Sequence, residues 1–195
     1  RSLVGSEMCI RDRNTHRAFV SDLAASTQMQ VIHLDYPLSP EHPYPEAIDA
    51  LFDVYLLLLE QGIQAKDIIL SGDSCGANLA LALALRIRDE QRPQVSGLIL
   101  LSPFLDLSLT SESIRYNSKL DALLSIEALE TGIDYYVPEQ IDPADPLVSP
   151  LFDDLADLPP TLVQVGSKEI LLDDAQRFKD KATKAGVDVT FKLYT

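Results

Sequence analysis

A serine with a glycine two residues away on either side lies between a strand-like segment and a helix-like segment. Residues 72–76 read G-D-S-C-G, with the serine at position 74; β-branched and apolar residues 68–70 precede them, and strong helix formers at 78–85 follow. Glycine lets the chain reverse where a Cβ would collide, so a strand and a helix can meet at one tight turn. The pattern predicts a nucleophile elbow that presents the Ser74 hydroxyl at the end of a strand. The alternative is a serine and glycine loop that only caps a helix.

Strand-like and helix-like patterns alternate along the rest of the chain. This alternation predicts an α/β fold with a mainly parallel sheet and helices on both faces. Active sites in such sheets lie at the carboxyl ends of the strands. Residues 104–160 hold six prolines, and we expect them to form a cap or insertion over that edge. Strands are predicted near residues 30–34, 68–70, 95–101, 162–165 and 187–193, and two short helices near 120–124 and 126–136.

Composition narrows the class of partner. The chain has 195 residues, 46% of them hydrophobic, which is typical of one globular domain. Its formal net charge of −14 disfavours a nucleic acid or an anionic membrane surface as a partner. The longest apolar runs are far shorter than the roughly 20 residues that span a bilayer. We therefore expect a small neutral molecule as the partner and no membrane span.

The first 13 residues do not share the patterns of the remainder. Residues 1–13 resemble a translated sequencing-adapter peptide, and we interpret them as a non-native segment ahead of a partial domain at 14–195. Setting them aside leaves Cys75 as the single cysteine, which excludes an internal disulfide. A lone thiol favours a reducing compartment, here the cytoplasm.

A serine hydroxyl becomes a strong nucleophile when a base takes its proton and a carboxylate orients that base. In an elbow fold these groups follow one another as serine, acid and histidine. Glu169, just after the predicted strand at 162–165, is the preferred acid, and Asp173 is the reserve. All three histidines precede Ser74, so we expect them to be packed or hydrogen-bonded residues and not the base.

The same reaction needs donors for an oxyanion. The backbone N–H of Cys75, the residue after the nucleophile, is the first predicted donor. The glycine-rich loop that would supply the others is absent. We expect no metal and no cofactor, because the histidines are scattered and the sequence contains no G-x-G-x-x-G or phosphate-binding loop.

Three stretches together resemble the hormone-sensitive-lipase-like branch of the α/β-hydrolases, in particular its bacterial carboxylesterases. Residues 72–78 resemble G-D-S-A-G-G-N, residues 35–43 resemble D-Y-R-L-A-P-E-H-P, and residues 166–173 resemble G-x-x-D-x-L-x-D. The resemblance covers residues 14–195. Glu169 stands where the family usually has aspartate, and the family's H-G-G-G loop and histidine would lie before residue 14 and after Thr195.

The resemblance implies an internal fragment of a serine carboxylesterase or lipase-like enzyme. Such an enzyme would act on short to medium acyl esters or on lactones through an acyl-enzyme, with Ser74 and Glu169 catalytic. The 195-residue chain would itself be inactive, because the histidine and the glycine-rich loop are missing. Two alternatives remain: a ligand-binding protein on a hydrolase scaffold, and an amidase or peptidase of the same fold.

Overall fold

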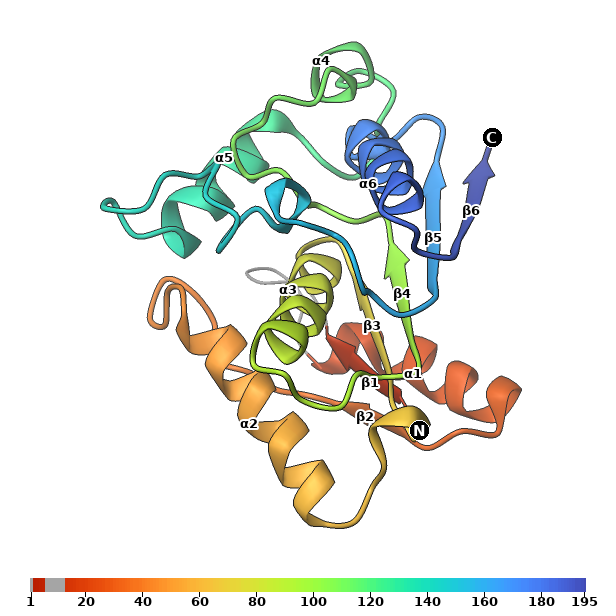
Figure 1. Ribbon diagram of the computed structural model, residues 1–195. Coiled ribbons are helices and arrows are strands. Elements are labelled where there is room, and N and C mark those ends of the chain that lie inside the picture. The colour runs from red at the N-terminus through yellow and green to blue at the C-terminus, as the bar shows by residue number, and fades with distance from the viewer. Residues whose placement is uncertain (1, 6–12) are drawn as a thin grey trace.

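In the part of the chain that the structure describes, six parallel strands form one sheet at the centre of the molecule (Figure 1). The computed structural model describes residues 2–5 and 13–195. The strand order is β2-β1-β3-β4-β5-β6, and every neighbouring pair is parallel. The strands are β1 (Ser2–Gly5), β2 (Val31–His33), β3 (Ile69–Asp73), β4 (Gly97–Leu101), β5 (Thr161–Gly166) and β6 (Val189–Tyr194).

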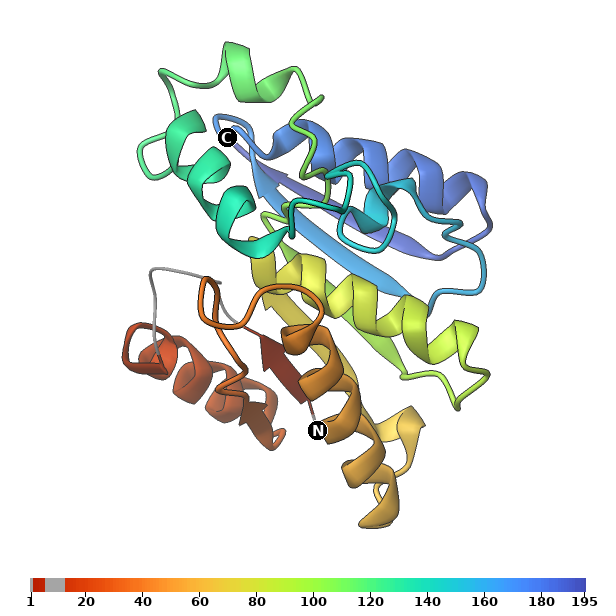
Figure 2. The ribbon, with the colours of Figure 1, turned by 90° about the vertical axis from the view of Figure 1, so that its left-hand side faces the viewer.

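Helices cover both faces of this sheet, which confirms the predicted fold class. In Figure 2 helix α1 lies on one face, and α2, α3 and α6 lie on the other. Parallel strands need such crossovers, since each chain must return to the same end of the sheet. The long helices are α1 (Arg13–Thr27), α2 (Glu46–Glu60), α3 (Cys75–Asp89) and α6 (Leu172–Lys184).

Helix α3 is the most enclosed of these elements. Ten of its fifteen residues are buried, because it packs against the sheet on one side and against α2 on the other. Its alternating leucines and alanines supply apolar surface all round, which is the pattern of a buried helix. The serine turn at its start is therefore held by the rigid centre of the fold.

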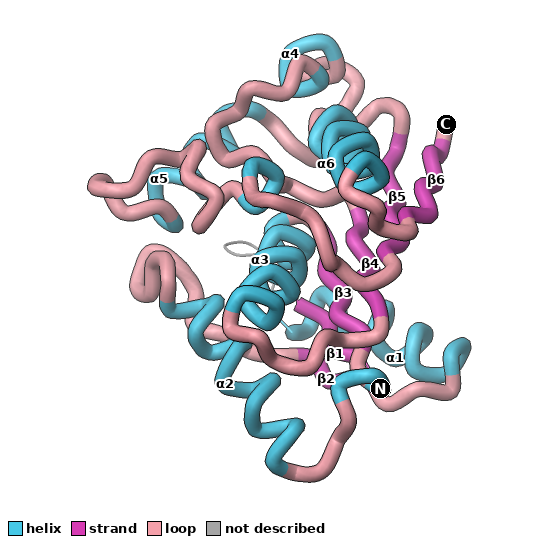
Figure 3. Tube along the Cα trace, in the orientation of Figure 1, coloured by secondary structure: helices cyan, strands magenta, loops and turns pink. Residues whose placement is uncertain are grey.

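The segment between β4 and β5 lies beyond the carboxyl ends of the strands (Figure 1). It is mostly loop, as Figure 3 shows, with two helices, α4 (Ser113–Tyr116) and α5 (Ile126–Tyr136). Helix α5 confirms the prediction at 126–136. The predicted helix at 120–124 is wrong: there the Asp121 carboxylate accepts hydrogen bonds from Leu123 N–H (2.8 Å) and Leu124 N–H (2.9 Å), which forms a turn. The described residues also form two 3₁₀ turns, η1 (Ala65–Asp67) before β3 and η2 (Pro150–Phe152) before β5.

Part of the segment that we interpret as non-native occupies a place in the sheet. Strand β1 pairs with β2 on one side and with β3 on the other. Residues 1 and 6–12 lie outside the described residues. The foreign origin of residues 1–13 concerns the coding sequence and stays a prediction.

Candidate active site

Ser74 lies at the tight turn between β3 and α3, as the sequence predicted. Its backbone has φ 53° and ψ −118°, a conformation that side-chain-bearing residues rarely adopt. A Cβ at Gly72 would overlap the carbonyl oxygen of Gly76 and lie 2.6 Å from the amide nitrogen of Ala77. Position 72 therefore requires glycine, because the strand and the helix approach too closely for any side chain.

The backbone of the turn is fixed to the neighbouring strand. Ser74 N–H donates to the carbonyl oxygen of Leu101 (2.9 Å), and the Ser74 carbonyl accepts from Phe104 N–H (3.2 Å) and Ala77 N–H (3.1 Å). The Ser74 residue is only 7% exposed. A strained conformation persists when its surroundings determine it, and these bonds do so here.

Cys75 is the first residue of α3. Backbone N–H groups of the first turn of a helix have no partner within the helix and carry its positive dipole end. The Cys75 N–H is therefore in position to stabilise an anion that forms at Ser74. The Cys75 Sγ lies 3.9 Å from the Ser74 Oγ, and the side chain packs partly against the hydrophobic core.

Glu169 lies in the turn between β5 and α6. Its Oε1 accepts a hydrogen bond from Gly166 N–H at 2.6 Å, and no described residue donates to its Oε2. A Cβ at Gly166 would lie 2.7 Å from that Oε1, so glycine leaves room for the carboxylate. Ser74 follows β3 and Glu169 follows β5, so both lie at the carboxyl ends of the strands. Only β4 separates β3 from β5, and two strand spacings amount to about 10 Å.

The reserve acid is engaged elsewhere. Asp173 accepts hydrogen bonds from Ser113 N–H (2.8 Å) and from the Tyr116 hydroxyl (2.7 Å). Burial is the largest cause that raises the pKa of Tyr116 to about 12, and the hydrogen bond to Asp173 acts in the same direction. Both carboxylate oxygens of Asp173 thus have donors from the α4 segment, whereas Glu169 keeps one oxygen without a described donor.

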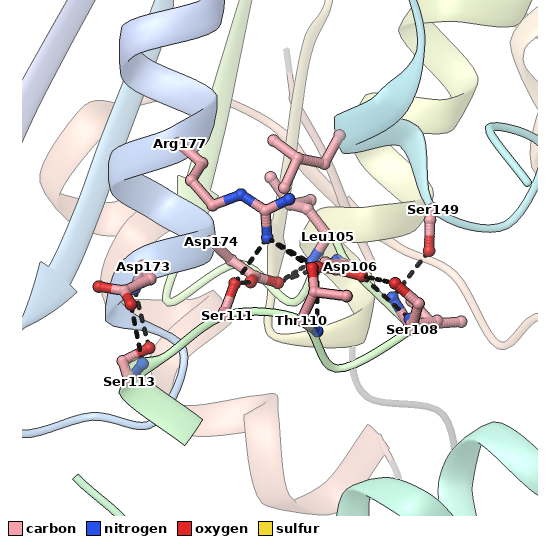
Figure 4. A network of polar contacts seen from close by, with 12 residues as sticks. Leu105, Asp106, Ser108, Thr110, Ser111, Ser113, Ser149, Asp173, Asp174 and Arg177 are labelled. Carbon is pink, nitrogen blue, oxygen red and sulfur yellow. Dashed lines mark hydrogen bonds and ion pairs between the residues drawn. The ribbon is translucent and has the colours of Figure 1, made fainter. Parts of the chain in front are cut away.

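A buried polar network, which the sequence did not reveal, joins the loop after β4 to α6 (Figure 4). Asp174 is fully buried and accepts from Leu105 N–H (2.7 Å), Asp106 N–H (2.9 Å) and the Ser111 hydroxyl. Burial raises the pKa of Asp174 to about 6, although these hydrogen bonds oppose the shift. In the sequence Asp174 could not be told from an ordinary carboxylate in the first turn of a helix.

Asp106 is the second buried carboxylate of this network. Burial by itself raises its pKa, but hydrogen bonds from Ser108, Thr110 and Arg177 outweigh burial and the pKa lies below its usual value. Arg177 of α6 approaches Asp106 to 2.7 Å and the Ser111 hydroxyl to 2.9 Å. The loop and the helix are therefore tied together beside residues 166–173, the turn that carries the candidate acid Glu169 and that we call the acid turn.

None of the three histidines forms a hydrogen bond with Ser74 or Glu169 within the described part of the chain. His16 is buried, and its Nε2 lies 3.1 Å from the Asp73 Oδ2. Its ring stacks on that of His33 with 6.3 Å between centroids. His42 pairs with Glu46 on the surface of the molecule. The contact between His16 and Asp73, the residue before Ser74, had no signal in the sequence.

No group of three histidine, cysteine, aspartate or glutamate side chains at 16–195 is placed to hold a metal ion. No helix in the described ranges is long and apolar enough to cross a membrane.

Comparisons with known proteins agree with this geometry. A family model described as an alpha/beta hydrolase fold matches residues 4–195. An esterase of Acinetobacter venetianus is 68% identical over 191 residues, which are 98% of this chain and 63% of that protein. An acetyl-hydrolase of Streptomyces hygroscopicus is 36% identical over 190 residues, 97% of this chain and 63% of that protein.

A solved structure has a similar fold. A crystal structure of an esterase from the bacterial hormone-sensitive lipase family has a TM-score of 0.94 and 34% identity. The match covers 99% of this chain and 66% of that one. The chain thus spans a little under two thirds of the length of these relatives.

Proposed function

Because this chain belongs to the α/β-hydrolase family, we propose that the protein containing it hydrolyses carboxylic esters with Ser74 as nucleophile. The observation that carries the proposal is the strained conformation of Ser74 between β3 and α3. Strain of this kind is kept at functional sites, where it presents a side chain that relaxed geometry would turn away. The esterases among the relatives support the same reaction class.

The proposed reaction has two steps. The Ser74 Oγ attacks the ester carbonyl carbon while a base takes its proton, and the negative charge moves to the carbonyl oxygen. The Cys75 N–H at the start of α3 stabilises that oxygen. The intermediate then collapses, the base returns the proton to the leaving alcohol, and water hydrolyses the acyl-serine by the same route.

Glu169 is the proposed acid of this site. Its carboxylate would hold the base in the correct tautomer and stabilise its protonated form. The Oε2 atom, which has no described donor, is the oxygen that this role requires. Asp173 is disfavoured because Ser113 and Tyr116 already donate to it.

We propose that the histidine base lies in a part of the relatives that this chain does not span, and that the glycine-rich oxyanion loop belongs where the adapter-like residues 1–13 now stand. Strand β6 pairs with β5 up to Tyr194, and Ser167 N–H donates to the Tyr194 carbonyl at 2.7 Å. Residues joined after Thr195 would therefore leave the sheet beside the acid turn. The 195-residue chain alone would show little or no turnover, because loss of one triad member costs several orders of magnitude.

The proposed substrates are small neutral esters. The formal charge of −14 disfavours polyanionic substrates, and one relative is named an acetyl-hydrolase, which favours short acyl groups. Medium acyl chains and lactones are the next candidates. A cytoplasmic location stays a prediction, which rests on Cys75 being the single cysteine of residues 14–195.

The test is hydrolysis of 4-nitrophenyl butyrate by the full-length protein and by its Ser74→Ala variant. We expect kcat/KM to fall by about 10⁴-fold or more. Ser96→Ala is the matched control: Ser96 bonds to the Ile68 carbonyl at the opposite edge of the sheet, so activity should be kept. A fluorophosphonate probe should label Ser74 alone. Hydrolysis that survives Ser74→Ala contradicts the proposal, and an inert full-length protein without a downstream histidine favours the ligand-binding alternative.

A further inference from the structure

The acid turn, residues 166–173, carries Glu169 but belongs to no helix or strand over most of its length. Strand β5 ends at Gly166 and α6 begins at Leu172. A turn at the surface is ordinarily the most mobile part of a fold. Orientation of a base needs a carboxylate that is fixed to within about 0.5 Å, so other contacts must hold this turn.

Asn117, at the end of α4, forms hydrogen bonds with the backbone around Glu169. Its Nδ2 donates to the carbonyl oxygens of Glu169 (2.8 Å) and Ser167 (3.2 Å). The Asn117 residue is only 3% exposed, so water does not compete for these bonds. One amide group therefore fixes the peptide unit before Lys168 and the peptide unit after Glu169.

Asp121 holds the residue that follows the acid. Its Oδ2 accepts from Ile170 N–H at 2.9 Å, while its Oδ1 accepts from Leu123 and Leu124. The carboxylate thus joins its own turn to the acid turn. The same residues 120–124 that failed to form a helix supply this contact.

Ser113 holds the carboxyl-terminal part of the acid turn. Its hydroxyl donates to the Ile170 carbonyl (2.6 Å) and accepts from Asp173 N–H (3.0 Å), and the residue is fully buried. Its own N–H donates to the Asp173 carboxylate. Figure 4 shows Ser113 and Asp173 facing one another across this contact. The three polar residues lie within nine positions of one another in the sequence, at 113–121.

We propose that residues 113–121 are a positioning clamp for Glu169, with Asn117 and Asp121 as its main contacts. The inference rests on the proposed function, since it assigns a task to the acid of that site. The clamp fixes the main chain on both sides of Glu169, while Gly166 N–H fixes the carboxylate itself at 2.6 Å. The acid is thereby oriented before a base or substrate arrives, which lowers the cost of orientation during the reaction.

The test is Asn117→Ala in the full-length protein, with Ser118→Ala as the matched control. The Ser118 hydroxyl donates only to the Arg115 carbonyl within the described contacts and does not touch the acid turn. We expect Asn117→Ala to lower kcat by about 100-fold with KM within about twofold of wild type. The acid limb of the pH profile should move to lower pH, because a misplaced carboxylate raises the pKa of the base less. Ser118→Ala should match wild type in both readouts.

The second readout does not depend on turnover. The Gly166 amide proton bonds to the Glu169 carboxylate at 2.6 Å, so its NMR signal should lie downfield and should respond when that contact loosens. Asn117→Ala should move this signal upfield, and Asp121→Asn, which keeps the side-chain volume, should do the same if Asn117→Ala does not fold. An unchanged Gly166 response and kcat in the variants overturns the clamp. A wild-type protein without turnover overturns the proposed function, while the Gly166 response still decides whether the clamp exists.

Discussion

At the scale of single residues, the two carboxylates near the acid turn differ in what they already bind. Among the residues that the structure describes, one group donates a hydrogen bond to the Glu169 carboxylate, the main-chain N–H of Gly166 at 2.6 Å. Asp173 receives two, from Ser113 N–H and the Tyr116 hydroxyl. A carboxylate that keeps a free acceptor can orient a base, whereas one with both oxygens engaged serves the structure around it.

The difference predicts opposite outcomes for two isosteric substitutions in the full-length protein. Glu169→Gln should lower kcat by about 10⁴-fold, because a neutral amide neither fixes the tautomer nor stabilises the protonated base. Asp173→Asn should keep most of the activity and lower the pKa of Tyr116 from about 12 toward its ordinary value of 10.0. Esterase kinetics and ultraviolet titration of the tyrosines measure the two effects. Loss of activity in Asp173→Asn with retention in Glu169→Gln would exchange the two roles.

The elbow was predictable from the sequence and the contacts that support it were not, for a physical reason. The elbow is local: Gly72 and Ser74 lie two residues apart, and the clash at position 72 follows from the turn itself. The position of Glu169 in the turn after a strand was predictable from the sequence pattern and from the family motif, and its role as the acid stays a proposal. Asn117 and Asp174 act on residues more than 45 positions away in the sequence, and no local pattern distinguishes them from surface polar residues.

At the scale of elements, α6 is held to the loop after β4 by the two buried carboxylates shown in Figure 4. Asp174 comes from the helix and Asp106 from the loop, and Arg177 bonds to the latter. The helix is therefore placed by polar contacts in addition to its apolar face, which carries Ala175 and Phe178. Polar contacts also decide the structure of residues 120–124. Leucines at helical spacing suggested a helix there, but Leu123 N–H and Leu124 N–H donate to the Asp121 carboxylate and the segment forms a turn.

The raised pKa of Asp174 predicts how the free energy of unfolding depends on pH. Since the folded-state pKa of about 6 exceeds the ordinary 3.8, this group stabilises the fold fully below pH 3.8 and loses that contribution as pH rises through 6. The advantage of wild type over Asp174→Asn should therefore shrink by up to about 3 kcal/mol between pH 4 and pH 7. Urea unfolding of the full-length protein at several pH values measures it.

Asp180→Asn is the control for this series, because Asp180 lies on the same helix with its side chain 74% exposed. Its free energy of unfolding should differ from that of wild type by a nearly constant amount over the same pH range. A constant difference for Asp174→Asn as well would contradict the raised pKa.

At the scale of the whole molecule, the sheet ends in an exposed strand. β6 is the outermost strand beside β5 in the described sheet, and Leu193 and Tyr194 at its end are 46% and 56% exposed. An open strand edge with apolar side chains is a template for pairing with another chain. The negative charge of the molecule opposes such contact only within about 10 Å, since salt screens the repulsion at longer distances.

We therefore expect the 195-residue chain to self-associate through β6 when it is expressed alone. Leu193→Glu should keep it monomeric to severalfold higher concentrations, as measured by light scattering at physiological salt. Thr190→Glu adds the same charge to another exposed position of the same strand and should protect much less. Equal protection by both substitutions would point to net charge and not to the strand end, and a wild-type chain that stays monomeric would contradict the expectation outright.

The contacts of residues 113–121 also bear on how such enzymes could be recombined. An exchange of the whole region 104–160 between two esterases, made to transfer substrate preference, would also replace the residues that hold the acid turn. Crossovers placed after residue 124 would transfer α5 and the loop that follows while leaving Asn117 and Asp121 with the acid they contact. The functional border of the exchangeable unit thus lies inside the inserted segment and not at the ends of the strands that flank it.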